Sequence, residues 1–320
     1  MYTDASKIGW GAEDDKISTG GQWAFWETGI HINILELKAV LFGLKSLAKG
    51  FSHIRLMIDN TTAVAYVNKM GGTKSIECNK LAKEIWQWAI STNTWLSAAH
   101  VPGRDNVGAD FQSRNFSVQK SSEWTVTEQV FEKIVKNFGK PDIDMFASRL
   151  NNKLPKYVSW RPDPSCFAVD AVLEWEGFFP YCFPPFSIIP KVLNHLQRQQ
   201  VKQAIVVAPM WTTQAWFPIY TSMMVSLPMI FPATREFLYH PSDPSASHAL
   251  ADKMKLMVAL LSADASICQA FHRKLYTLSC NHGDVELGPN MREFSENGTS
   301  FVARGMKIPF LHMQIQCCNS

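Results

Sequence analysis

The sequence predicts two α/β units in succession: a mixed five-stranded sheet with helices, followed by a second, smaller α/β domain. Over residues 1–115, short strands of β-branched and apolar residues alternate with segments of helical periodicity. A polar stretch at 115–127 interrupts this alternation, and a second α/β pattern follows it. With 320 residues and 46% hydrophobic content, the chain can bury a core in each unit.

These changes in pattern divide the chain into four expected segments. The first domain takes residues 1–115, a linker with a helix takes 116–140, and the second domain takes 141–235. The remaining C-terminal extension, 236–320, has no architecture that the pattern defines.

The first domain is expected to begin with three antiparallel strands. Residues 1–4 form the stub of a strand, and 8–12 and 21–27 form two more. The polar segment 13–20 joins the last two as a turn. The short connections favour antiparallel pairing of all three.

The principal helix of this domain is expected at 34–49. Its apolar residues recur at helical spacing, and Gly50 follows in the position where glycine commonly ends helices. A short apolar strand is expected at 53–59, and two further helices at 61–70 and 75–92.

The last elements of the first domain are a strand at 94–99, a loop at 100–105 and a short helix that begins near Asn106. Further along the chain, strands are expected at 143–146, 181–183 and 203–209. Two later helices are expected at 187–200 and 247–262. The second unit thus contains a strand, a Pro-Pro turn, a helix and a strand in that order.

Charge and cysteine content limit the classes of function only loosely. A net charge of +3 permits a polyanionic partner without requiring one. The seven cysteines are scattered and lack C-x-x-C spacing, which favours a reducing compartment over a disulfide framework or a structural zinc site. Neither a signal peptide nor a membrane-spanning apolar stretch is evident, so we expect an intracellular protein, cytoplasmic or nuclear. The oligomeric state is left open.

Four acidic residues, Asp4, Glu36, Asp59 and Asp110, are the main candidates for a functional site. Each is expected where a strand or helix ends or turns toward a common edge, and each lies among apolar residues. An unpaired charge is costly to bury in such surroundings. Divalent cations are the simplest way to offset four clustered charges.

Each acid also has an ordinary structural explanation. Asp4 could start a turn, Glu36 could complete a capping box with Asn33, and Asp59 and Asp110 lie where acids favour a helix start. Capping does not require the four acids to occur in a fixed order along a strand, a helix, a strand and a helix. That order favours one shared site.

The residues around the four acids form four motifs. They are Thr3-Asp4-Ala5-Ser6, Glu36-Leu37-Lys38-Ala39-Val40, Asp59-Asn60-Thr61-Thr62-Ala63-Val64, and His100-Val101-Pro102-Gly103 continuing through Asn106 to Ala109-Asp110. In this order they resemble the type I ribonuclease H family. More narrowly, residues 1–114 resemble the ribonuclease H domain of DIRS-type retrotransposons.

This resemblance implies hydrolysis of the RNA strand in RNA–DNA hybrids during retrotransposon reverse transcription. It implies two Mg²⁺ ions, which Mn²⁺ could replace, held about 3.5–4 Å apart as in other two-metal sites. By the same resemblance, Asp4 would bridge both ions, and Glu36, Asp59 and Asp110 would complete their ligand sets. A reverse transcriptase encoded upstream would be a partner.

Four further residues are candidates for catalysis or substrate binding. His100 precedes Asp110 by ten residues, the spacing at which the cellular enzymes place a histidine that assists proton transfer or product release. A loop histidine bonded to backbone is the alternative. Asn60, Thr61 and Asn106 could contact the hybrid, because short polar groups at helix N-termini suit phosphates and ribose hydroxyls.

Residues 141–232 resemble the methyltransferase-like region that follows ribonuclease H in DIRS-type elements. DNA adenine methyltransferases carry Asp, Asn or Ser before Pro-Pro-Tyr/Phe, whereas Phe183 precedes Pro184-Pro185-Phe186 here. A phenyl ring cannot accept the hydrogen bond of the target amine. No glycine-rich loop for S-adenosylmethionine is evident near Phe146. We therefore do not expect methyl transfer, and ligand binding by this domain is left open.

Several functions stay open beside the hybrid ribonuclease. Only three residues precede Asp4, so a shortened first strand could leave a nucleic-acid-binding remnant with weak catalysis. A DNA adenine methyltransferase is disfavoured by Phe183. A transposase or integrase on the same fold is a further alternative, because fold alone does not determine the reaction.

Overall fold

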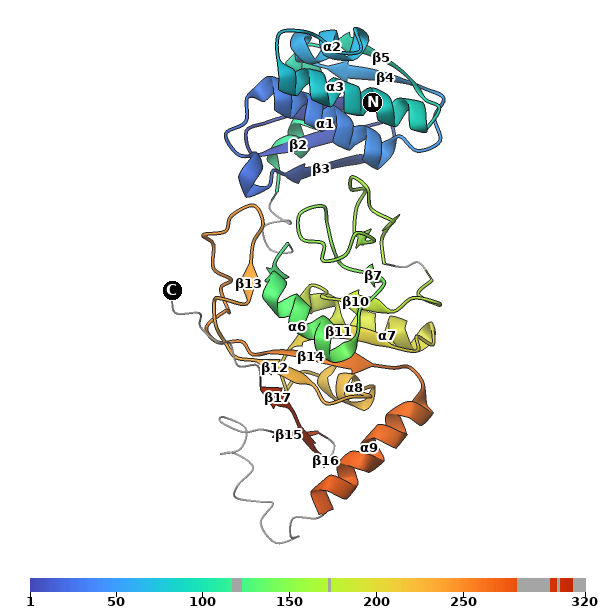
Figure 1. Ribbon diagram of the computed structural model, residues 1–320, viewed down its shortest axis with the longest axis vertical. Coiled ribbons are helices and arrows are strands. Elements are labelled where there is room, and N and C mark those ends of the chain that lie inside the picture. Colours follow the sequence, from blue (N-terminus) through green and yellow to red (C-terminus); the bar gives the residue numbers. More distant parts are fainter. Residues whose placement is uncertain (117–122, 172–173, 281–299, 304–305, 313–320) are drawn as a thin grey trace.

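The computed structural model describes residues 1–116, 123–171, 174–280, 300–303 and 306–312. Figure 1 shows two units that follow each other along the long axis of the molecule, with the N-terminal unit at one end. No helix among the described residues is long and apolar enough to cross a membrane.

The first unit is built on the expected mixed sheet of five strands. These are β1 (Tyr2–Ala5), β2 (Gly9–Glu13), β3 (Ser18–Gln22), β4 (His53–Ile58) and β5 (Trp95–His100), in the order β3-β2-β1-β4-β5. β1, β2 and β3 pair antiparallel, whereas β4 is parallel to both β1 and β5. β1 is therefore the central strand, although only Met1 precedes it.

The third strand differs from its predicted position at 21–27. It ends at Gln22, and a short 3-10 helix, η1 (Phe25–Glu27), follows it. The polar turn is also shorter than expected, because the Asp14 side chain accepts hydrogen bonds from the backbone nitrogens of Lys16 and Ile17 and so closes the turn before β3.

The helices of the first unit are α1 (Ile32–Leu47), α2 (Thr61–Asn68), α3 (Ile76–Ser91) and α4 (Val107–Arg114), with η2 (Gly103–Asp105) before the last. α1 begins two residues earlier than predicted, because His31 Nδ1 accepts from the backbone nitrogen of Asn33 and His31 is the N-cap. Asn33 therefore does not form a capping box with Glu36. The main core packs α1, α2 and α3 against β4 and β5 through Leu37, Leu44, Leu56, Val67 and Ile85.

α4 lies very close to β2. A Cβ atom at Gly11 would collide with the backbone of α4 at Ala109. Glycine at this position thus permits the close approach that brings α4, with Asp110, to the central strands.

The second unit has a six-stranded sheet in the order β17-β12-β14-β11-β10-β7. Its strands are β7 (Ile143–Asp144), β10 (Pro180–Cys182), β11 (Ala204–Pro209), β12 (Met229–Phe231), β14 (Leu256–Leu261) and β17 (Leu311–His312). β7, β10 and β11 are parallel, and β14 runs antiparallel between β11 and β12. The helices are α6 (Glu128–Phe138), η3 (Phe186–Ile188), α7 (Ile189–Arg198), α8 (Phe217–Ser222) and α9 (Ala265–Cys280).

Three small pairs complete the described strands. β6 (Thr125–Val126) pairs with β13 (Leu238–Tyr239), β8 (Val158–Ser159) with β9 (Ala168–Val169), and β15 (Ser300–Ala303) with β16 (Met306–Pro309). The strand, Pro-Pro turn, helix and strand predicted in the second unit correspond to β10, η3 with α7, and β11. Every residue of β11 is buried, as expected for a central strand.

The helix predicted at 247–262 is wrong. Its second half is the strand β14, with the sequence Leu-Met-Val-Ala-Leu-Leu, which pairs with strands on both sides. A short apolar run suits a buried strand as well as a helix, and periodicity alone does not separate the two. The second sheet thus extends beyond residue 235, where we placed the end of the domain.

The expected linker at 116–140 also contributes to the second unit. Val130, Phe131 and Ile134 of α6 belong to a core cluster with residues of β11 and β14.

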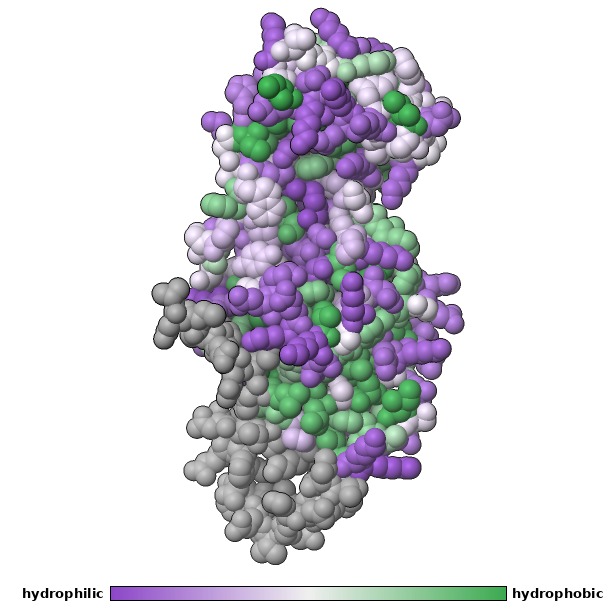
Figure 2. Space-filling view, viewed as in Figure 1, coloured by the Kyte–Doolittle hydropathy of each residue, from purple (hydrophilic) through white to green (hydrophobic). Residues whose placement is uncertain are grey.

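The surfaces of the units differ: Figure 2 shows hydrophilic side chains over most of the first unit and hydrophobic ones where α8 and β14 lie.

Candidate metal centre

The structure brings together three of the four predicted acids. Carboxylate oxygens of Asp4, Glu36 and Asp59 all lie within 4.8 Å of one another. Asp4 is in β1, and Asp59 directly follows the parallel neighbour β4, where Thr3 is paired with Ile58. The two acids are therefore level with each other, one residue beyond this pair. Glu36, in the second turn of α1, completes the group.

The fourth acid, Asp110, lies beside this group rather than in it. Its side chain is 44% exposed, and its Oδ1 is 2.7 Å from Nε of Arg114, one helical turn later. Asp110 is nevertheless close enough for its charge to raise the pKa of Asp4 and of Asp59, after the larger effect of burial. The predicted quartet is thus a trio of two buried acids and one half-buried acid, with an adjacent, ion-paired acid.

Ser113 joins α4 to the trio and was not predicted from the sequence. Its side chain is fully buried, and its hydroxyl donates to Oδ2 of Asp4 at 2.5 Å. Ser113 lies three residues after Asp110, so helical spacing turns both toward β1. That spacing is the one signal in the sequence that could have pointed to Ser113.

The trio is electrostatically unfavourable without a cation. Burial, followed by the charges of Asp4 and Asp59, raises the pKa of Glu36 to about 9. Burial also raises the pKa of Asp4 and of Asp59. In addition, Oε2 of Glu36 is buried and has no hydrogen-bond partner.

These residues fit a divalent cation. Hard cations such as Mg²⁺ prefer carboxylate oxygens, and the trio offers them from two adjacent strands and a helix. A cation would satisfy the unpartnered oxygen of Glu36 and offset charges that burial disfavours. Asp4, Glu36 and Asp59 are therefore residues that could hold a metal ion.

Asn60 and Thr61 lie at the start of α2, directly after Asp59. The Asn60 side chain caps the helix, because its Oδ1 accepts from the backbone nitrogen of Ala63 at 3.0 Å. Its amide nitrogen donates to Asn33 at 2.9 Å. Thr61 is exposed at the helix N-terminus. Of the two, Thr61 is the side chain left available to a ligand.

His100 and Asn106 flank the same edge in different ways. His100 is exposed at the end of β5, opposite Ile58, so it lies near Asp59. Asn106 is only 1% exposed, and its amide nitrogen donates to the carbonyl of Thr3 at 3.0 Å. This hydrogen bond ties the start of α4 to β1. A contact from Asn106 to a nucleic acid stays a prediction, and the structure provides this side chain with an internal partner.

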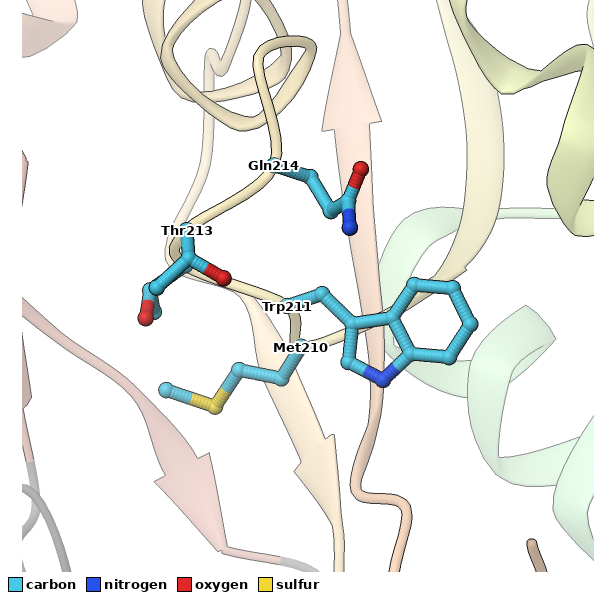
Figure 3. Close-up of a pocket in the computed structure, with 5 residues that line it drawn as sticks. Met210, Trp211, Thr213 and Gln214 are labelled. Carbon is cyan, nitrogen blue, oxygen red and sulfur yellow. The ribbon is translucent and has the colours of Figure 1, made fainter.

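The second unit has a separate pocket at the end of β11, lined by Met210, Trp211, Thr212, Thr213 and Gln214. In Figure 3, Trp211 and Gln214 extend to one side of the loop, and Met210 and Thr213 extend to the other. None of the lining residues is an acid, a base or a cysteine.

Phe183 follows β10 and is half-buried, with its ring centroid 6.3 Å from that of Phe186. The ring of Phe186 in turn lies 5.4 Å from that of Trp211. The residues of the Pro-Pro turn thus pack into an aromatic cluster rather than presenting a hydrogen-bond acceptor.

No family model and no curated protein matches the chain. Ribonuclease H1 of the halophilic archaeon Halobacterium salinarum NRC-1 is similar at 20% identity, over 37% of this chain and 96% of that one, with a TM-score of 0.31. LC11 ribonuclease H1, solved with an RNA/DNA hybrid, shares 17% identity over 34% of this chain and 88% of that one, with a TM-score of 0.30.

The N-terminal ribonuclease H domain of a Mycobacterium tuberculosis protein, solved as a maltose-binding-protein fusion, is similar at 17% identity. The match covers 34% of this chain and 88% of that one, with a TM-score of 0.28. Scores of this size do not establish a family, so the function must be inferred from the sheet and the three acids themselves.

Proposed function

We propose that the first unit hydrolyses the RNA strand of RNA–DNA hybrids with the help of divalent metal ions. The observation that carries this proposal is the trio Asp4, Glu36 and Asp59, whose carboxylate oxygens lie within 4.8 Å of one another. The mixed sheet and the motifs around the acids support it, because both agree with the resemblance to type I ribonuclease H.

The residues of the trio would share the work of holding metal ions. Asp4 lies on the central strand of the sheet and within 4.8 Å of both other acids, so it is the residue that would serve two ions. Asp110 would complete a second ligand set by exchanging its ion pair with Arg114 for a metal. When bound, such ions lower the pKa of an attacking water and stabilise the leaving oxygen of a phosphodiester. Mg²⁺ is the expected ion, and Mn²⁺ could replace it.

Other residues of this edge suit the substrate. Arg114 is exposed beside Asp110 and can donate to a phosphate, and Thr61 is exposed at a helix N-terminus, where phosphates bind well. Asn60 and Asn106 would act chiefly by shaping the start of α2 and α4. His100, exposed near Asp59, would assist proton transfer.

We infer further that hybrid cleavage serves retrotransposon reverse transcription, in concert with a reverse transcriptase encoded upstream. This part of the proposal rests on the narrower resemblance to DIRS-type elements. The aromatic cluster at Phe183 supports a second unit that does not transfer methyl groups.

The test is cleavage of a hybrid labelled on its RNA strand, with Mg²⁺ present. The wild-type chain should release RNA fragments, and Asp59→Asn should lose this activity because a ligand oxygen becomes an amide. Asp15→Asn is the matched control, since Asp15 is exposed in the turn before β3. Equal cleavage by wild type and Asp59→Asn would refute the proposal.

Two rival functions give different results in the same assay. A nucleic-acid-binding remnant would retain the hybrid without cutting it, which a gel-shift measurement detects. A transposase or integrase would cut duplex DNA in preference to the hybrid. Either result would replace the proposed function.

A further inference from the structure

The side chain of Arg149, which lies five residues after β7, links the second unit to the first. Its two terminal nitrogens donate to Oε1 and Oε2 of Glu27 at 3.3 and 3.0 Å. One of them also donates to the carbonyl of Gln22 at 3.1 Å. The guanidinium lies over the ring of Phe42, 4.6 Å from its centroid. Arg149 thus reaches from the second unit to β3, η1 and α1.

Glu27 connects Arg149 to α1 through a hydrogen bond with Lys38. Its Oε1 accepts from Nζ of Lys38 at 2.9 Å, and its Oε2 accepts from the backbone nitrogen of Ala24 at 2.8 Å. The side chain of Glu27 is only 5% exposed, and that of Arg149 is 18% exposed. Charged hydrogen bonds are strong in such buried surroundings, so the contact is a rigid one.

The two residues of α1 that take part lie on the face turned away from Glu36. Lys38 and Phe42 are four residues apart and therefore adjacent on the helix surface. Lys38 follows Glu36 by two positions, which is about 200° around the helix. The contact with Arg149 consequently holds the back of α1, while Glu36 faces Asp4 and Asp59.

The position of Glu36 depends on how α1 is held, because few hydrogen bonds hold the Glu36 carboxylate itself. Oε2 of its carboxylate has no partner, and a hydrogen bond from the backbone of Ala5 is the one that affects its charge. Its position among like charges is therefore determined by how α1 is held. A small rotation of the helix would move it out of the trio.

Arg149 is itself fixed from within the second unit. Its backbone nitrogen donates to Oδ1 of Asp163 at 3.0 Å, and the hydroxyl of Tyr157 donates to the same oxygen at 2.6 Å. Asp163 is buried, so this anchor is shielded from solvent. The backbone of Arg149, from which its side chain extends to α1, is therefore held by hydrogen bonds within the second unit.

We propose that Arg149 is a positioning residue of the metal centre, which acts from the second unit through Glu27 and Lys38 to hold α1 and hence Glu36. This inference rests on the proposed function of the trio. It makes the second unit a structural part of the hydrolase rather than an independent neighbour. The ligand whose binding it controls is a divalent cation.

The experiment measures Mg²⁺ binding by calorimetry and hybrid cleavage with the full chain. Arg149→Met should weaken Mg²⁺ binding about tenfold or more, the usual cost of removing a group that orients a metal ligand. Saturating Mg²⁺ should restore most of kcat, and KM for the hybrid should not change. Arg149→Lys should fall between, because lysine keeps the charge but neither pairs in bidentate fashion nor stacks on Phe42 in the same way.

The matched control is Arg235→Met. Arg235 also belongs to the second unit and pairs with Asp252 at 2.7 Å, but both side chains are largely exposed. Its Mg²⁺ affinity should equal that of the wild type. Lys38→Met provides a second variant, since it removes the hydrogen bond between α1 and Glu27 but leaves the pair between Arg149 and Glu27 and the contact with Phe42 in place. Lys38→Met should also weaken Mg²⁺ binding. It therefore tests the inference even if Arg149→Met does not fold.

The possible results separate this inference from the proposed function. Folded Arg149→Met that binds Mg²⁺ as tightly as wild type would overturn the positioning role, as would unchanged binding by Lys38→Met. A wild-type chain that binds Mg²⁺ but does not cut the hybrid would refute the function, and the affinities would still decide the role of Arg149. If the wild type binds no Mg²⁺, the positioning role of Arg149 in a metal centre is refuted together with the centre.

Discussion

Glu27 and Glu36 are both about 4% exposed and lie on different sides of α1, yet their electrostatic surroundings are opposite. Burial tends to raise the pKa of both. At Glu27 the Arg149 guanidinium, the backbone nitrogen of Ala24 and Lys38 outweigh burial, and the pKa is lowered. At Glu36 the neighbours are Asp4 and Asp59, and the pKa rises to about 9.

This difference shows what separates a structural carboxylate from a candidate metal ligand. Both acids are equally hidden, so burial alone does not identify the site. Glu27 has three donors, whereas Oε2 of Glu36 has none. A buried acid whose oxygen has no donor indicates a ligand site, and a paired one indicates a structural link.

The largest expected effect comes from the trio. Asp4→Asn should reduce hybrid cleavage to about a thousandth of wild type or less, since metal ions supply several kcal/mol of transition-state stabilisation and each 1.4 kcal/mol is tenfold. Initial rates with a labelled RNA strand measure it. The hydrogen bond from Ser113 can persist in this variant, so circular dichroism should show an intact fold. Retention of more than about a tenth of the activity would remove Asp4 from the site.

The corresponding change at the paired acid should act on stability. Glu27→Gln should lower the free energy of unfolding by about 3 kcal/mol, because it leaves the buried Arg149 without its carboxylate. Urea denaturation measures this loss. A change below about 1 kcal/mol would mean that the pair behaves like an exposed one, and the contrast with Glu36 would disappear.

Glu36→Gln should change the free energy of unfolding in the opposite direction to Glu27→Gln. In metal-free buffer it should raise the free energy of unfolding by about 1 kcal/mol, as expected when a destabilised functional residue is replaced. Thermal melts in a chelator measure the gain. The same variant should lose the rise in Tm that Mg²⁺ produces in the wild type. A loss of stability in metal-free buffer would show that Glu36 has a structural partner.

The smallest effect is the pH dependence of the Glu27 pair. Its folded-state pKa lies below the usual 4.5, so its contribution is present above about pH 4.5 and is lost as the pH falls through the folded-state pKa. The wild type should therefore lose stability in this acidic range more steeply than Glu27→Gln. Urea midpoints at pH 3.5 and 6 compare the two. Parallel losses in both proteins would contradict the assignment.

The two regions also differ in how far the sequence predicts them. The sequence predicts Asp4, Glu36, Asp59 and Asp110 as one site because each stands in a recognisable motif, and the structure groups the first three of them. Ser113 and Arg149 carry no such motif. The contact of Ser113 depends on the close approach of α4 to β2, and that of Arg149 depends on the packing of the two units. Both contacts belong to the tertiary structure, which local sequence patterns do not determine.

Secondary structure shows the same limit. The five strands of the first sheet follow from alternation and turns, although β3 was misplaced because the side chain of Asp14 closes its turn early. The sequence predicts a helix where the structure has the strand β14. Its all-apolar residues are explained only by two neighbouring strands, β11 and β12, which are far away in sequence.

The most direct test of the central claim is a Mg²⁺ titration of strand cleavage, with the RNA and DNA strands of one hybrid labelled separately. Our account predicts no cleavage in chelator, RNA fragments that increase with Mg²⁺, and an intact DNA strand. Cleavage in chelator, cleavage of the DNA strand, or no cleavage at any Mg²⁺ concentration would contradict it.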